Sequence, residues 1–255
     1  MSGVQQLQAA PRTGWHVAEV VETRRETPSA ARITLDVDGW PGNLAGQHLD
    51  VRLTAPDGYT ATRSYSIASS GDGERVVLAV DRLPDGEVSP FLVDELRAGD
   101  RLEVHGPLGA FFVWRPPADG GTGRPVQLIA GGSGVVPLVA IARAHAEAGD
   151  ATPFRLLYSV RTPDDVFFAD ELETAARGPA PFAVEFVYTR RAPAGTDAPV
   201  GRITRERLAA GVIGADAAPV VYVCGSTGFV ERVAGWLIEL GHHQTAIRTE
   251  RYGGT

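Results

Sequence analysis

The chain has 255 residues, of which 44% are hydrophobic and 22% charged, and its net charge is −7. This length suffices for one large domain or two medium ones, and the acidic balance argues against general nucleic-acid binding, which needs a basic face. No apolar segment approaches bilayer-spanning length, and residues 1–15 lack the charged start and apolar run of a secretion signal. We therefore expect a cytoplasmic protein that binds neither nucleic acid nor membrane.

Two residue types are scarce, and their scarcity excludes several chemistries. Cys224 is the single cysteine, so the chain can form no internal disulfide and cannot supply the roughly four thiolates of an iron–sulfur cluster. All 24 cationic side chains are arginines. The absence of lysine excludes Schiff-base catalysis and the lysine of a P-loop.

The first part of the chain, residues 12–115, has the pattern of short strands separated by Gly, Pro and Asp. One helix interrupts the pattern, with Ser89 as its predicted N-cap, Pro90 in its first turn and Gly99 as its stop. Such spacing indicates an antiparallel barrel or sandwich. The predicted strands are 15–26, 31–39, 46–54, 62–69, 74–83 and 100–106.

After a Pro/Gly-rich linker at 114–125 the sequence pattern changes. Residues 124–255 alternate apolar strands with helical patterns. This alternation is typical of a doubly wound α/β domain, in which helices cover both faces of a parallel sheet. The predicted strands are 126–130, 154–160, 182–189, 220–225 and 246–252, and the predicted helices are 136–149, 169–178 and 228–241.

Two glycine-rich turns follow strands in this second part. In "LIAGGSGVVPL", Gly131, Gly132 and Gly134 let the backbone approach a ligand, and the start of the following helix favours a phosphate. The turn is not the G-x-G-x-x-G fingerprint, so a structural tight turn explains it equally well. A second turn, "VCGSTGFV", ends another strand, and adjacent turns converge at the carboxyl ends of parallel strands. Together the two turns favour a nucleotide-binding crevice. Cys224, taken alone, is interpreted as a small buried hydrophobic residue.

Arginines follow two strands at the same predicted edge. Ser159 and Arg161 end one strand, and Arg190 and Arg191 end the next. Guanidinium groups suit the 2′-phosphate that distinguishes NADP from NAD, because they bind it through charge and paired hydrogen bonds. The pattern therefore favours NADP(H), with NAD(H) as the alternative, while solvated loop arginines remain the plainer explanation. His242 and His243 are interpreted as a solvated turn rather than a metal site, and we predict no metal.

Seven segments occur in the order found in one family. They are "RSYSIAS", "PDGEVSPFL", "GPLGAFF", "AGGSGVVPL", "YSVRTPDDVFFADEL", "VCGSTGFV" and "RTERYGG". From about residue 15 the chain resembles the ferredoxin–NADP(+) reductase superfamily, and more narrowly the FAD- and NAD(P)-binding part of bacterial oxygenase reductases. The resemblance implies a six-stranded antiparallel Greek-key β-barrel that binds FAD, followed by a doubly wound α/β domain with a five-stranded parallel sheet that binds NAD(P).

The resemblance also implies roles on the flavin side. Arg63 is expected to pair with a flavin phosphate, Tyr65 to cover the isoalloxazine ring and Ser66 to reach its reactive edge. The segment around Ser89 is expected to hold the pyrophosphate, which favours FAD over FMN. The full set of expected flavin contacts is Arg63, Ser64, Tyr65, Ser66, Val80, Arg82, Gly86, Val88 and Ser89.

On the nucleotide side, the family pattern places Cys224 and Gly225 beside the nicotinamide. It also places Tyr252 near the flavin, although three residues follow this tyrosine here. We expect Ser66, Tyr65, Cys224 and Tyr252 to surround the reacting atoms. The expected nucleotide contacts are Gly131, Gly132, Ser133, Gly134, Pro137, Ser159, Arg161, Arg190, Cys224, Gly225, Ser226, Thr227 and Tyr252.

The resemblance implies an NADPH-dependent flavoprotein reductase in which hydride passes to the flavin and single electrons then leave. Because the chain lacks the thiolates of an iron–sulfur domain, the expected acceptor is a separate redox protein such as a ferredoxin or flavodoxin. Two alternatives stay open at this point. One is a reductase of ferric chelates, siderophores or free flavin; the other is a flavin-bearing binding module that does not turn over nucleotide.

Overall fold

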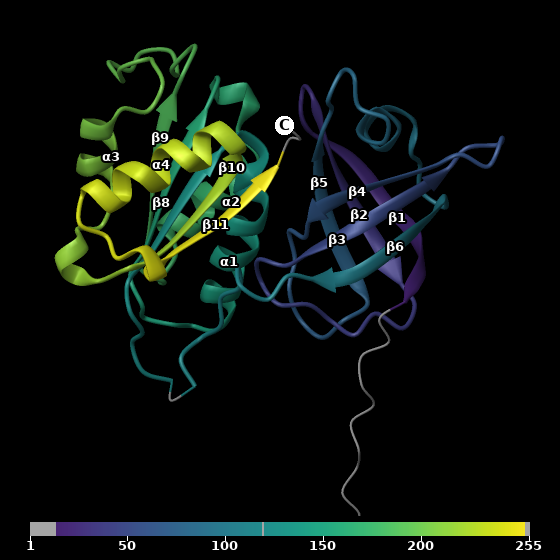
Figure 1. Ribbon diagram of the computed structural model, residues 1–255, viewed down its shortest axis with the longest axis horizontal. Helices are drawn as coiled ribbons and strands as arrows, with labels where there is room; N and C mark the ends of the chain where they lie inside the picture. The colour runs from purple at the N-terminus through teal and green to yellow at the C-terminus, as the bar shows by residue number, and fades with distance from the viewer. Residues whose placement is uncertain (1–13, 119, 253–255) are drawn as a thin grey trace, which may run out of the picture.

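The computed structural model describes residues 14–118 and 120–252, which form two bodies side by side (Figure 1). One body holds strands β1 to β6, and the other holds β7 to β11 with their helices. No helix in these two stretches is long and apolar enough to cross a membrane. The expected lack of a secretion signal concerns residues 1–15, of which 1–13 lie outside the described residues.

The first body is an antiparallel sheet with the strand order β4-β3-β6-β1-β2-β5. A bridge between Ile67, which follows the edge strand β4, and Leu78 in the other edge strand, β5, brings the two edges together, so the sheet curls into the predicted six-stranded barrel. Alternate residues such as Ile33 and Leu35 fill its interior and are fully buried. The strands are β1 (Trp15–Thr27), β2 (Ala30–Val37), β3 (His48–Thr54), β4 (Thr60–Ser66), β5 (Arg75–Asp81) and β6 (Arg101–Leu108).

The helix predicted within the barrel differs from expectation. It is one short turn with a π-helical segment η1 (Phe91–Glu95), and it ends before Gly99. The hydroxyl of Ser89 does not cap it, because this oxygen accepts a hydrogen bond from the backbone N–H of Leu83 at 3.0 Å. The serine therefore holds the preceding loop against the helix start.

The second body has the predicted five parallel strands, and their order in the sheet is β11-β10-β7-β8-β9. They are β7 (Val126–Gly131), β8 (Phe154–Val160), β9 (Phe182–Tyr188), β10 (Val220–Ser226) and β11 (Ile247–Tyr252). The helices are α1 (Val135–Glu147), α2 (Ala169–Arg177), α3 (Arg205–Gly211) and α4 (Thr227–Glu239), with single turns η2 (Gly132–Gly134), η3 (Pro163–Asp165), η4 (Ala215–Ala217) and η5 (Gln244–Ala246).

The helices cover both faces of this sheet. Helices α1 and α2 share one apolar cluster, and α3 and α4 share another on the opposite face. Helix α3 was not predicted, although Thr204 before it is a regular N-cap whose side chain accepts from the N–H of Arg207. In the predicted turn at 242–243, His243 is exposed but His242 is buried, so the expectation of a solvated turn holds for only one of the two histidines.

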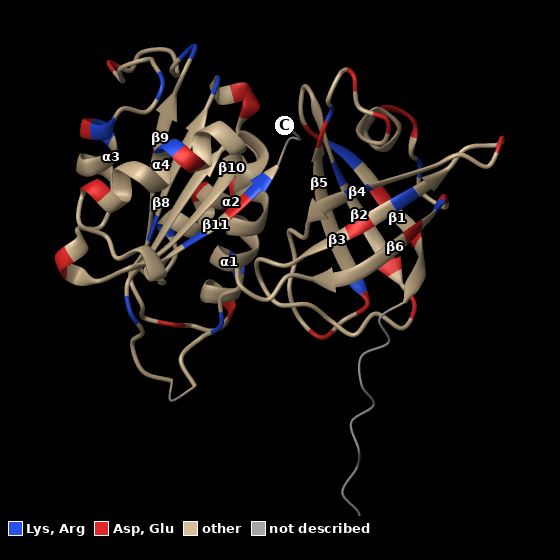
Figure 2. Ribbon diagram, viewed as in Figure 1, with Lys and Arg blue, Asp and Glu red and all other residues tan. Residues whose placement is uncertain are grey.

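The two bodies are joined by packing and by charge. The apolar cluster around α1 includes Ala30, Ala45 and Ala68 of the barrel. The carboxylate of Glu171 in α2 pairs with Arg32 of β2 and with Arg143 of α1. Acidic and basic side chains are mixed over both bodies (Figure 2), so the net negative charge is not confined to one of them. The junction therefore fixes how the edge of the barrel faces the α/β body.

Candidate active site

A cavity of about 260 Å³ opens beside β4, on the side of the barrel that faces the α/β body. It contains eight of the nine expected flavin contacts. Its lining residues are Arg63, Ser64, Tyr65, Ser66, Ala79, Val80, Asp81, Leu83, Gly86, Glu87, Val88, Ser89, Ser133, Val136 and Tyr252.

Four consecutive residues of β4, Arg63 to Ser66, line this cavity even though neighbouring strand residues point to opposite faces. The reason is that β4 is an edge strand paired only with β3. Its second edge presents unpaired backbone N–H and C=O groups, which a planar heterocycle with donors and acceptors can bind. Strand β4 is poor in apolar residues because much of it lines this cavity and does not belong to the core.

Tyr65 supplies the aromatic surface of the cavity. It packs against the barrel core, and burial raises the pKa of its hydroxyl to about 12, only partly offset by the charge of Arg63. The ring therefore stays neutral at physiological pH. Its neighbour Ser64 donates a hydrogen bond to Asp50 at 2.5 Å, whereas no interaction recorded for the described residues engages the hydroxyl of Ser66.

Two arginines expected at the flavin are held by carboxylates. Arg63 pairs with Glu87, which also accepts a hydrogen bond from the hydroxyl of Tyr59 at 3.0 Å. Arg63 still lines the cavity, so it lies where expected, but its charge is shared with Glu87. Arg82 does not line the cavity; its guanidinium donates to Asp94 at 2.7 Å.

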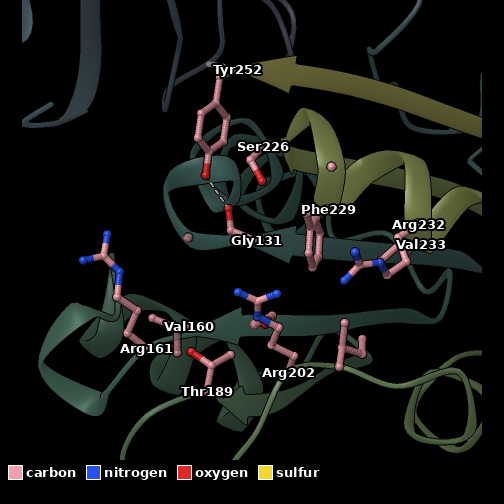
Figure 3. Close-up of a pocket in the computed structure, with 14 residues that line it drawn as sticks. Gly131, Val160, Arg161, Thr189, Arg202, Ser226, Phe229, Arg232, Val233 and Tyr252 are labelled. Carbon is pink, nitrogen blue, oxygen red and sulfur yellow. Dashed lines mark hydrogen bonds between the residues drawn. The ribbon is translucent and has the colours of Figure 1, made fainter. Parts of the chain in front are cut away.

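A second cavity, of about 460 Å³, lies at the carboxyl ends of the parallel strands (Figure 3). The ends of β7, β8 and β10 and the start of α4 contribute to its wall, as the two glycine turns predict. Its lining residues are Gly131, Gly132, Ser159, Val160, Arg161, Thr189, Arg202, Ile203, Ser226, Gly228, Phe229, Arg232, Val233 and Tyr252.

The two glycine turns touch each other directly. A Cβ atom at Gly134 would lie closer than 3.0 Å to backbone atoms of Cys224 and Gly225. At Gly131 and Gly225 a Cβ would instead meet the ring of Phe229. The glycines are thus required for close packing of the turns, and Phe229 covers them on the cavity side.

Cys224 is almost completely buried, and burial raises the pKa of its thiol well above the usual value. The thiol therefore keeps its proton and is not a nucleophile. Neither Cys224 nor Gly134, Pro137, Gly225 or Thr227 lines the cavity surface. Gly134 packs against Cys224 and Gly225 behind this surface, and Ser133 lines the barrel cavity instead.

Tyr252 lines both cavities and connects them. Its hydroxyl donates a hydrogen bond to the backbone carbonyl of Gly131 at 2.6 Å, as Figure 3 shows. The last residue of β11 is thereby fixed on the first glycine turn. The side chain of Tyr252 therefore lies at the place where a ligand in one cavity would contact a ligand in the other.

Three arginines line the second cavity: Arg161, Arg202 and Arg232. None of them forms an ion pair with a carboxylate of the described residues. Arg190 is exposed and absent from the lining, and its backbone N–H bonds to the carbonyl of Arg161 at 2.9 Å. Sequence reasoning missed Arg202 and Arg232, which come from the end of a long loop and from the second turn of α4.

A carboxyl group sits at the junction of the two bodies. Glu250 of β11 is paired with Cys224 in the parallel register, and its Oε1 lies 3.5 Å from Nδ1 of His48 in the barrel. Burial raises the pKa of Glu250 to about 7, and its Oε2 is buried without a hydrogen-bond partner. Burial also lowers the pKa of His48, with the charge of Asp50 opposing this. Both shifts favour neutral side chains at the contact.

The raised pKa makes Glu250 a source of pH-dependent stability. Because the folded protein binds this proton more tightly than the unfolded chain, the stabilisation is complete below about pH 4.5 and is lost as the pH rises toward 7. Glu250→Gln should abolish this loss of stability, which amounts to about 3 kcal/mol over that window in the wild-type protein. Thermal melts from pH 4.5 to 8 check this, with the exposed Glu173→Gln as control. Parallel curves for the wild-type protein and Glu250→Gln would contradict it.

Comparisons with known proteins agree with this geometry. The model of the oxidoreductase FAD-binding domain matches residues 18–113, and that of the oxidoreductase NAD-binding domain matches residues 128–235. Ferredoxin–NADP reductase B of Sorangium cellulosum is 36% identical over 216 residues, covering 82% of this chain and 84% of the relative.

Longer relatives match in part. Methane monooxygenase component C of Methylosinus trichosporium is 34% identical over 172 residues, which is 68% of this chain but only 46% of that protein. This chain thus spans about half the length of that oxygenase component. Among solved structures, the Amycolatopsis cytochrome P450 reductase superposes with a TM-score of 0.79 at 27% identity, covering 93% of this chain and 69% of that one.

The resemblance seen in the seven sequence segments is therefore confirmed. The barrel and the parallel sheet are the two folds that the matching domain models describe, and the Sorangium relative matches across both. This chain belongs to the ferredoxin–NADP reductase family of oxidoreductases, whose members combine an FAD-binding domain with an NAD(P)-binding domain.

Proposed function

We propose that this protein oxidises NADPH by means of a bound FAD and delivers the electrons to a separate redox protein. The observation that carries the proposal is the pair of cavities that meet at Tyr252. One cavity has the edge strand and aromatic wall suited to a flavin, and the other has the glycine turns and arginines suited to a dinucleotide phosphate.

The barrel cavity fits FAD. Tyr65 offers a neutral aromatic face, Val80 and Val88 an apolar wall, and Arg63 a cation for phosphate. Gly86 lets the loop pack closely on Ser89, because a Cβ there would lie 2.8 Å from the hydroxyl of Ser89. When bound, FAD supplies hydride acceptance and one-electron release. The proposed roles of Ser66 and Tyr252 are to border the reacting atoms and exclude water, while the buried Cys224 supports the turn behind them; none of the three has to move a proton for hydride transfer.

The second cavity fits NADPH. The backbone at Gly131, Gly132 and the start of α1 approaches the position of a pyrophosphate. Arg161 and Arg202, whose charges no described carboxylate neutralises, are proposed to bind the 2′-phosphate. In this proposal Arg202 binds the phosphate in place of Arg190, which was expected there from the sequence.

The acceptor is proposed from the composition and from the relatives. A single cysteine cannot supply the thiolates of an iron–sulfur cluster, which supports an acceptor separate from this chain. One relative is named a ferredoxin–NADP reductase, and others are named electron-transfer or reductase components of oxygenases. We therefore propose a ferredoxin, a flavodoxin or an oxygenase component as the acceptor.

Anaerobic spectroscopy of the purified protein tests the proposal. A yellow protein should be bleached by one equivalent of NADPH, more slowly by NADH, and reoxidised by ferredoxin faster than by ferric citrate or free FMN. A yellow protein that neither nucleotide bleaches would show a binding module without turnover. Preference for ferric citrate or free FMN would instead establish the small-molecule reductase.

A further inference from the structure

A third cavity, of about 450 Å³, lies at the opposite end of the parallel sheet, where β7 and β10 begin. Its volume falls within the range of small-molecule sites. It shares no lining residue with either of the other two cavities. Its lining residues are Ala110, Phe111, Val113, Trp114, Arg115, Pro117, Gly123, Arg124, Val126, Thr152, Val220, Tyr222 and Arg248.

The charges on this lining are all positive. Arg115, Arg124 and Arg248 line the cavity, and its described lining contains neither Asp nor Glu. The charged residues of the second cavity are likewise all arginines, whereas over the two bodies as a whole acidic and basic residues are mixed (Figure 2). The buried Asp150 accepts a hydrogen bond from Thr152 but does not itself line the cavity. The site therefore attracts anions in a protein that is negative overall.

Two of the three guanidinium groups are held in place without being neutralised. Arg124 donates to the carbonyl of Ala218 at 2.8 Å, and Arg248 donates to the carbonyl of Val113 at 2.6 Å and to the hydroxyl of Tyr222 at 2.9 Å. These partners carry no charge, and none of the three arginines pairs with a described carboxylate. Fixed cations with spare N–H groups are the usual arrangement for carboxylate binding.

Aromatic rings form the rest of the wall. The side chain of Phe111 is 63% exposed, which is unusual for so large an apolar group. The guanidinium carbon of Arg248 lies 5.7 Å from its ring centre and 5.2 Å from that of Tyr222. A ligand ring stacked here would cover Phe111 while its anionic group met the arginines.

We propose that this cavity, defined by Phe111, Arg115, Arg124, Tyr222 and Arg248, binds a small aromatic carboxylate. A carboxylate suits it better than a phosphate, since no glycine turn at a helix start lines the described wall. The one glycine N–H in the lining, that of Gly123, already donates to the hydroxyl of Thr152 at 2.7 Å. The site is separate from the flavin and nucleotide cavities and does not depend on the proposed function.

Calorimetric titration of the flavin-loaded protein with benzoate tests the proposal, with and without saturating NADP+. Benzoate should bind with a dissociation constant below about 1 mM, equally in both conditions. Benzamide, which lacks the charge, and acetate, which lacks the ring, should each bind at least about tenfold more weakly. Failure of benzoate to bind below 10 mM, or its displacement by NADP+, would overturn the assignment.

Exposed residues provide variants that leave the fold intact. Arg115→Ala should weaken benzoate binding about tenfold or more, and Phe111→Ala about threefold to tenfold. Arg24→Ala removes an exposed arginine of β1 with no recorded ion pair, and should leave the affinity unchanged. A crystal soaked with benzoate should show its carboxylate on Arg115 or Arg248. If Arg115→Ala and Phe111→Ala both bind benzoate like the wild type, the ligand lies elsewhere and the proposal fails.

Discussion

The double variant Arg161→Ala/Arg202→Ala should lower kcat/KM for NADPH by about 10²–10⁴-fold and that for NADH by less than about threefold. Each guanidinium hydrogen bond to a phosphate contributes about 1.5–3 kcal/mol, and every 1.4 kcal/mol corresponds to a factor of ten. NADH lacks the 2′-phosphate, so it loses none of these contacts. Steady-state kinetics with both nucleotides and an artificial one-electron acceptor give the comparison directly.

The variant Arg190→Ala tests whether the phosphate is bound by Arg202, which lines the cavity, or by Arg190, which was predicted from the sequence. Its exposed guanidinium does not line the cavity, so its replacement should change the NADPH/NADH ratio by less than about threefold. A large loss with Arg190→Ala and none with Arg202→Ala would restore the sequence-based choice. Equal losses for NADPH and NADH in the double variant would show that neither arginine reads the 2′-phosphate.

The sequence could predict those parts of the site whose residues lie close together along the chain. The run from Arg63 to Ser66 lines one cavity and the turn at Gly131 lines the other, because a strand edge and a strand–turn–helix unit are local structures. The six- and five-stranded sheets follow from period-two and apolar strand patterns in the same way. A resemblance spread over seven segments then predicted a barrel domain followed by an α/β domain.

Side-chain partners far apart in the sequence were not predictable. Arg202 reaches the nucleotide cavity because Gly201 bonds back to the carbonyl of Tyr188 at 2.9 Å, which folds the long loop against the end of β9. Arg82 is drawn away from the flavin cavity by Asp94, and Arg63 shares its charge with Glu87. The first outcome depends on a backbone hydrogen bond and the other two on which carboxylate the fold brings near, and sequence spacing carries no information about either.

Gly134→Ala should destabilise the protein by about 3 kcal/mol and impair nucleotide binding. The new methyl group would lie closer than 3.0 Å to three backbone atoms of Cys224 and Gly225, and backbone at the end of a central strand cannot yield as a flexible side chain does. Because φ at Gly134 is −61°, the cost comes from this contact and not from backbone strain. For a chain of this size the unfolding midpoint should fall by roughly 6–12 °C.

Gly235→Ala provides the matched control, because it adds the same methyl group where no atom lies within 4 Å. It lies inside α4, where alanine favours the helix by up to about 1 kcal/mol, so its midpoint should rise slightly. Opposite signs for the two substitutions, measured by thermal melts, would show that contact between the two glycine turns shapes the crevice. The NADPH dissociation constant should rise only in Gly134→Ala. Equal stability of both variants would mean that the turns can separate without cost, and the crevice would then not be preformed.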